Sequence, residues 1–122
     1  MESKGKKILV ADDENDILEI ISYNLVSEGY EVFTVKDGNE ALDMARKIHP
    51  DLIILDILLS GNDGRTICKR LKKDKSTGNI PVIMISAHPS AHETIAECGA
   101  DSFIAKPFSV SDLLKQVEEH VN

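Results

Sequence analysis

Short runs of consecutive hydrophobic residues recur along the chain, and between them hydrophobic residues return every three or four positions. The runs have the length of buried strands and lie at 8–11, 32–35, 52–55, 82–85 and 103–105. Stretches with the helical spacing lie at 17–25, 41–48, 67–71 and 113–121, and a weaker one lies at 90–97. The pattern therefore predicts five strands that alternate with five helices.

Glycine and proline residues stand between these elements, where the chain must turn. They are Gly29, Gly38, Pro50, Gly78, Pro81 and Gly99. Strands that are hydrophobic throughout are typical of a parallel sheet with helices on both faces. Residues 1–122 provide enough chain for one such core and no second domain. We expect a single α/β domain, a doubly wound (βα)5 three-layer sandwich.

The charge of the chain limits the partners that it can have. Its formal net charge is −7, whereas a surface that binds nucleic acid is usually basic. Lysine and arginine cluster between 69 and 75, which we interpret as the solvated face and last turn of a helix. The first hydrophobic run is too short for a signal peptide or a membrane span. We expect a cytoplasmic protein without a direct nucleic-acid or membrane partner.

The spacing of cysteine and histidine does not indicate a metal centre. Cys68 and Cys98 lie far apart, without the spacing of a zinc site or a disulfide framework. We expect both to be reduced and partly buried. His88 and His92 are four residues apart, but no third ligand lies nearby, so a surface position is the better interpretation.

Polar side chains follow four of the five predicted strands, at the point where each strand ends. They are Asp12 and Asp13, Asp56, Ser86 and Lys106. In an open parallel sheet the carboxyl ends of the strands meet at one edge, where ligands bind. Carboxylate oxygens suit Mg²⁺, and a lysine and a serine suit the oxygens of a phosphoryl group. One of the carboxylates could then act as a nucleophile and form an acyl phosphate.

Each of these residues also has an ordinary structural interpretation. An aspartate at a strand end is more often the N-cap of the next helix than a ligand, and a lone lysine is usually a surface residue. Five suitable residues at the ends of four strands are a much less probable accident. The combination therefore favours a site for phosphoryl chemistry.

Four segments resemble, in the right order, the signature segments of the receiver domain of two-component response regulators. They read ILVADDE, PDLIILDILL, PVIMISA and GADSFIAKPF, and together they span essentially the whole chain. The resemblance implies a flavodoxin-like sheet with the strand order 2-1-3-4-5. It also implies a phosphorylation-controlled signalling module and not a conventional enzyme.

The resemblance implies a role for each residue of the metal site. Asp56 matches the phosphoacceptor, Asp13 a direct metal ligand, and Asp12 a ligand that acts largely through water. The backbone carbonyl of Leu58 completes the protein ligands of Mg²⁺ or Mn²⁺. The phosphoryl donor is expected to be the phosphohistidine of a histidine kinase or a phosphotransfer protein.

Three further positions match the switch of such domains. Ser86 matches the hydroxyl that turns toward the phosphoryl group, Lys106 the phosphate-binding lysine, and Phe103 the switch aromatic residue. The resemblance implies that phosphorylation changes the face formed by the fourth helix, fifth strand and fifth helix, where a downstream protein binds. It also allows a phosphorylation-dependent dimer.

Glu14, Leu58 and His88 occupy variable positions near the site and are expected to tune the lifetime of the acyl phosphate. An apolar Leu58 is expected to hinder the attacking water. Many relatives have a proline four residues after the acceptor, where this chain has Ser60, and we expect a more mobile loop at 60–64. The segment between 86 and 106 is about two residues shorter than in many relatives.

Two other functions remain open from the sequence. A degenerate receiver would keep the fold and serve only in protein interaction. A metal-dependent aspartyl-phosphate hydrolase would need an acid/base aspartate two residues after the nucleophile, where this chain has Leu58.

Overall fold

The central element of the protein is a five-stranded parallel sheet. The computed structural model describes residues 5–87 and 97–121. The strands of the sheet are β1 (Lys7–Ala11), β2 (Glu31–Val35), β3 (Leu52–Asp56), β6 (Val82–Ser86) and β7 (Ser102–Ala105). Their spatial order is β2-β1-β3-β6-β7, and every neighbouring pair is parallel. This confirms the predicted order 2-1-3-4-5, and each strand lies within one residue of its predicted ends.

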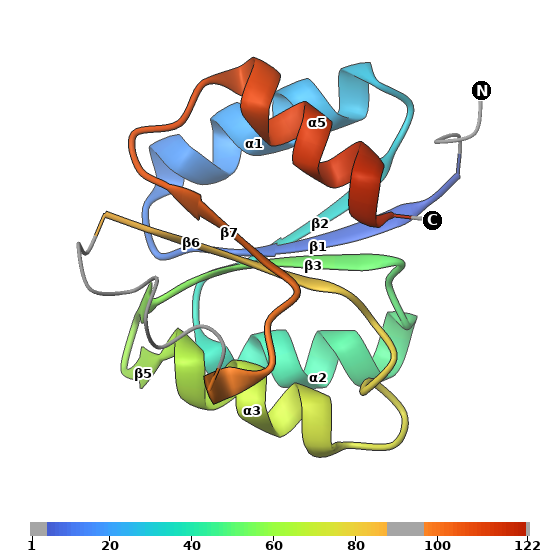
Figure 1. Cartoon of the computed structure of the whole chain (residues 1–122), viewed down its shortest axis with the longest axis vertical. Coiled ribbons are helices and arrows are strands. Elements are labelled where there is room, and N and C mark those ends of the chain that lie inside the picture. The colour runs from blue at the N-terminus through green and yellow to red at the C-terminus, as the bar shows by residue number, and fades with distance from the viewer. Residues whose placement is uncertain (1–4, 88–96, 122) are drawn as a thin grey trace.

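Helices cover both faces of this sheet. They are α1 (Asn15–Ser27), α2 (Gly38–Ile48), α3 (Gly64–Lys73) and α5 (Val110–His120). Helices α1 and α5 lie on one face, and α2 and α3 lie on the other (Figure 1). The helix predicted at 90–97 falls almost wholly outside the described residues. In the described ranges, no helix is long and apolar enough to cross a membrane.

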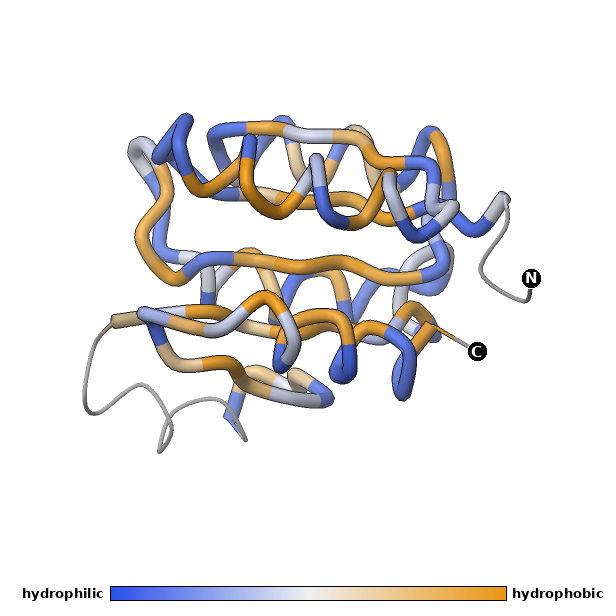
Figure 2. The backbone as a smooth tube through the Cα atoms, turned by 90° about the horizontal axis from the view of Figure 1, so that it is seen from above, coloured by the Kyte–Doolittle hydropathy of each residue, from blue (hydrophilic) through white to orange (hydrophobic). Residues whose placement is uncertain are grey.

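The sheet separates two hydrophobic cores. Along β3, Leu52 and Ile54 face α1 and α5, whereas Ile53 and Leu55 face α2 and α3. All four side chains are fully buried, as the uninterrupted hydrophobic runs predict. In Figure 2 the hydrophobic colour predominates along the central strands and alternates with the hydrophilic colour along helices. The doubly wound architecture is therefore confirmed.

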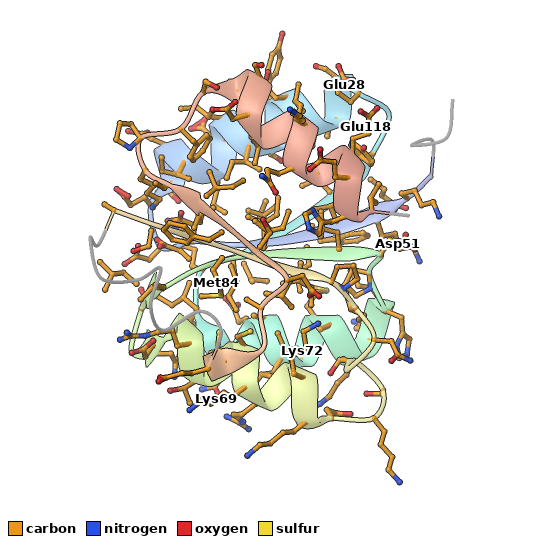
Figure 3. All side chains as sticks on the ribbon, viewed as in Figure 1. Glu28, Asp51, Lys69, Lys72, Met84 and Glu118 are labelled. Carbon is orange, nitrogen blue, oxygen red and sulfur yellow. The ribbon has the colours of Figure 1, made fainter. Side chains whose placement is uncertain are left out.

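The two cysteines lie deeper than the sequence suggests. Cys68 and Cys98 are 0% and 3% exposed, so the expectation of partial burial is wrong. The thiol of Cys68 donates to the backbone carbonyl of Cys98 over 3.3 Å, and burial raises the pKa of this thiol. Both side chains belong to the core between the sheet and α3, which also contains Met84 (Figure 3).

One lysine of the basic cluster has a structural role. Lys69 is exposed on α3, as predicted, but Lys72 points back toward the sheet (Figure 3). The ammonium of Lys72 donates to the carbonyl of Ile80 over 2.8 Å and to the Asp101 carboxylate over 2.9 Å. Asp101 in turn accepts from the backbone N–H of Val82. Lys72 therefore ties α3 to the amino ends of β6 and β7.

The buried sheet predicts a large difference between two isoleucine substitutions. Ile54→Ala leaves a cavity beside α1 and α5, and we expect it to lower the free energy of unfolding by about 2–5 kcal/mol. Ile20→Ala is the matched control, because Ile20 is 45% exposed and its loss should cost about 0.5 kcal/mol or less. Urea denaturation measures both, and equal costs would contradict the two-sided burial of β3.

Candidate functional site

The residues predicted to form the site meet at the carboxyl edge of the sheet. Asp12 follows β1, Asp56 ends β3, and Lys106 follows β7. The ammonium of Lys106 lies 3.1 Å from Oδ2 of Asp12 and 3.0 Å from Oδ2 of Asp56. One cation therefore bridges two carboxylates that come from neighbouring strands.

The sheet hydrogen bonds continue past the strand ends and fix the backbone of the site. The N–H of Asp12 donates to the carbonyl of Val35, and that of Lys106 donates to the carbonyl of Ser86. Asp12 is 0% exposed and Asp56 is 3% exposed. The two carboxylates are thus held rigidly in a poorly solvated position, where unpaired charge is costly.

Three carboxylates of the site could hold a cation. Oxygen atoms of Asp12, Asp13 and Asp56 lie within 4.8 Å of one another. Asp13 is exposed whereas the other two are buried, so the group opens to water on one side. Mg²⁺ and Mn²⁺ prefer oxygen ligands, and Mg²⁺ keeps several waters in its coordination shell. The donor set and its open side therefore fit such an ion.

Burial changes the acid–base properties of Asp56. Loss of solvation raises the pKa of its carboxyl from 3.8 to about 6, and the nearby Asp12 charge adds to this rise. Hydrogen bonds from Lys106 and the Leu58 backbone N–H act in the opposite direction. Burial also lowers the pKa of Lys106, but its bonds to Asp56 and Asp12 outweigh this effect and raise the pKa above its usual value. The negative charge of the site is therefore only partly compensated.

The other predicted site residues that the structure describes lie on or beside neighbouring strands and helices. Glu14 is the N-cap of α1, and its Oε2 lies 3.5 Å from Nζ of Lys106. Leu58 is 69% exposed, and Ser86 is buried at the end of β6. Phe103 is partly buried in β7 and packs against the core beneath α2 and α3. His88 lies outside the described residues.

The segment after Asp56 forms a hairpin that the sequence did not predict. Strands β4 (Leu58–Leu59) and β5 (Asn62–Asp63) pair antiparallel. The segment 60–64 therefore contains the hairpin turn and β5, and its mobility stays a prediction. Ser60 and Gly61 form the turn, and Gly61 has a φ of 73°, which suits glycine. This Ser-Gly pair is the signal that could have indicated the hairpin.

Comparisons with known proteins agree with the geometry. Residues 8–118 match the family model of the response regulator receiver domain. The chain is 36% identical to the receiver domain of NtrX from Brucella abortus, with a TM-score of 0.85 over 93% of this chain and 97% of that one. It is 30% identical to the chemotaxis response regulator CheY4 of Vibrio cholerae, with a TM-score of 0.89 over 98% of this chain and 100% of that one.

A third similar structure contains a metal ion. It is the receiver domain of the sensor histidine kinase PA1611 from Pseudomonas aeruginosa PAO1, which has a magnesium ion coordinated in its active-site cleft. The two chains are 26% identical, and the TM-score is 0.89 over 96% of this chain and 98% of that one.

The raised pKa of Asp56 predicts a pH-dependent stability in metal-free protein. The folded state holds this proton more tightly than the unfolded state, so the contribution of Asp56 to stability falls as pH rises from about 4 to 6. Above this window, we expect Asp56→Asn to raise the free energy of unfolding by about 1–3 kcal/mol. Urea denaturation of both proteins in EDTA measures this difference in the free energy of unfolding.

The stability gained by Asp56→Asn should shrink as the pH is lowered from about 6 to 4, because wild-type Asp56 is then neutral as well. A variant that is no more stable than wild type at pH 7.5, or a gain that does not depend on pH, would contradict the assignment.

Proposed function

This chain belongs to the family of response regulator receiver domains, and from that membership we propose that Asp56 accepts a phosphoryl group from a phosphohistidine. The donor is a histidine kinase or a phosphotransfer protein of a two-component system. The observation that carries the proposal is the buried Asp56 carboxylate, which is bound by Lys106 within the Asp12–Asp13–Asp56 group.

The reaction is a displacement at phosphorus. A carboxylate oxygen of Asp56 forms a bond to phosphorus, the P–N bond to the donor histidine breaks, and its electron pair returns to the imidazole. Lys106 stays beside the Asp56 carboxylate and neutralises charge on the phosphoryl oxygens. The product is an acyl phosphate on Asp56.

Asp12, Asp13, Asp56 and the backbone carbonyl of Leu58 are proposed to hold Mg²⁺ or Mn²⁺. When bound, the cation supplies positive charge against the phosphoryl oxygens. Two observations support this proposal: the proximity of the three carboxylates and the magnesium ion in the similar PA1611 receiver domain. Asp12 is buried beside Lys106 and Asp13 is exposed, which agrees with an indirect and a direct ligand respectively.

The switch is proposed to pass from Ser86 to Phe103. They lie on adjacent strands, because Ser86 ends β6 and pairs with Ala105 of β7, two residues after Phe103. Movement of these side chains would change the surface of the predicted helix at 90–97, β7 and α5. This surface is the proposed binding site for a downstream protein or for a second phosphorylated copy.

Residues 1–122 are proposed to act as a single signalling domain that catalyses its own phosphorylation and dephosphorylation. The lifetime of the acyl phosphate depends on which side chains limit the access of water to it. Leu58 is exposed beside Asp56, and Glu14 contacts Lys106 at the rim. We assign this modulating role to both residues, and to His88 from the sequence alone.

The acceptor assignment predicts a selective loss of phosphorylation. Asp56→Asn removes the nucleophilic carboxylate, so uptake of a phosphoryl group from acetyl phosphate and Mg²⁺ should be abolished. Asp43→Asn is the matched control, because Asp43 is exposed on α2, and it should be labelled like wild type. Intact-protein mass spectrometry measures the added group. Full labelling of the Asp56 variant would refute the assignment, and wild type that takes no phosphoryl group from any donor would favour an interaction-only receiver.

The metal assignment predicts that Asp13→Asn weakens Mg²⁺ binding. Asp13 is exposed, so its loss should leave the fold intact while the dissociation constant rises on the order of tenfold or more. Asp16→Asn, at an exposed position one turn away in α1, is the control. Titration calorimetry reports the affinity, and equal affinities of the two variants would be inconsistent with Asp13 as a ligand.

A further inference from the structure

A side chain of the hairpin joins it to the start of α2. Oδ1 of Asn62 accepts a hydrogen bond from the backbone N–H of Gly38 over 3.0 Å. Residues 37 and 60 form a second link, an isolated parallel bridge. The hairpin and α2 are about two dozen residues apart in sequence, so these contacts depend on the tertiary structure.

The Asn62 contact satisfies a helix terminus. The first N–H groups of a helix have no acceptor within the helix. Asp37 is the N-cap of α2 and accepts from the N–H of Glu40 over 2.8 Å. Asn62 accepts from the N–H of Gly38 instead. Two side chains from separate segments therefore share the first turn of α2, which fixes the position of β5 against the helix.

The pairing of β5 with β4 links the position of β5 to the phosphoacceptor site. Asn62 pairs with Leu59, and Asp63 pairs with Leu58. The Leu58 backbone is close enough to the Asp56 carboxylate to lower its pKa, and the carbonyl of Leu58 is the proposed metal ligand. A shift of β5 would therefore move the Leu58 backbone relative to the reacting carboxylate.

Other contacts hold the base of the hairpin, and Asp63 at the end of β5 caps α3 by accepting from the N–H of Arg65. The N–H of Gly64 donates to the carbonyl of Ile57 over 2.7 Å, and any side chain at Gly64 would clash with the backbone of Asp56. Leu59 is buried and anchors β4 in the core. The Leu58 side chain is mostly exposed and contributes little packing. The backbone of Leu58 is therefore positioned by its neighbours.

We propose that Asn62 is a positioning residue of the phosphoacceptor site, because its bond to Gly38 holds the β4–β5 hairpin and so places the Leu58 backbone beside Asp56. This inference rests on the proposed function, since it assigns Asn62 to the same metal and phosphoryl site.

Two substitutions at one position test the role of the acceptor oxygen. Asn62→Leu keeps the branch at Cγ and has no acceptor, whereas Asn62→Asp keeps an oxygen at the same place. Asn79→Leu, at an exposed loop position, is the control for an added leucine. If Asn62→Leu does not fold, Asn62→Ala takes its place, because it also removes the acceptor oxygen. We expect the same results from Asn62→Ala as from Asn62→Leu.

Two measurements separate positioning from stability. Amide exchange of metal-free protein, followed by NMR, reports the Gly38 N–H, and we expect roughly tenfold faster exchange in Asn62→Leu. Titration calorimetry with Mg²⁺ should show a dissociation constant about three- to tenfold higher in that variant. Asn62→Asp and Asn79→Leu should stay within about twofold of wild type in both measurements.

The outcomes distinguish this inference from the proposed function. If Asn62→Leu leaves Mg²⁺ affinity unchanged while wild type binds the ion, the inference is overturned and the proposed function stands. An Asn62→Asp variant as weak as Asn62→Leu also overturns it, because the acceptor oxygen would not be the cause. Wild type that binds no Mg²⁺ overturns the proposed function and this inference together.

Discussion

The sharing of one ammonium group between two buried carboxylates is the constraint on which the site depends. Asp12 and Asp56 are almost fully excluded from water and both contact Nζ of Lys106. A single lysine cannot compensate these two charges together with that of Asp13. Burial, with a smaller contribution from the Asp12 charge, raises the pKa of Asp56 to about 6. The uncompensated negative charge is what would give the site affinity for a divalent cation.

The parallel sheet makes this costly arrangement stable. Strands β1, β3 and β6 are buried on both faces, so their carboxyl ends cannot separate without disrupting two cores at once. The charged residues of the site lie at the carboxyl ends of β1, β3 and β7, along one edge of the sheet. The buried strands thus fix the position of the acceptor carboxylate.

Local sequence predicted the strands and the strand-end residues, because full burial produces uninterrupted hydrophobic runs and parallel topology brings their ends together. It did not predict the β4–β5 hairpin, since two-residue strands are too short to show a period. Nor could it reveal the contact of Asn62 with Gly38 or the bridge from Lys72 to Asp101, which join segments distant in sequence. The burial of Asp12 and the exposure of Asp13 also depend on tertiary packing, because the two residues are adjacent and chemically identical.

The central claim is that Asp56 is the one carboxylate that forms an acyl phosphate. Its most direct test treats wild-type protein with acetyl phosphate and Mg²⁺, reduces the acyl phosphate with borohydride, and locates the resulting homoserine by peptide mass spectrometry. We expect homoserine at position 56 alone, and none in the presence of EDTA. Homoserine at position 12 or 13, or labelling that does not require the metal, would contradict this claim.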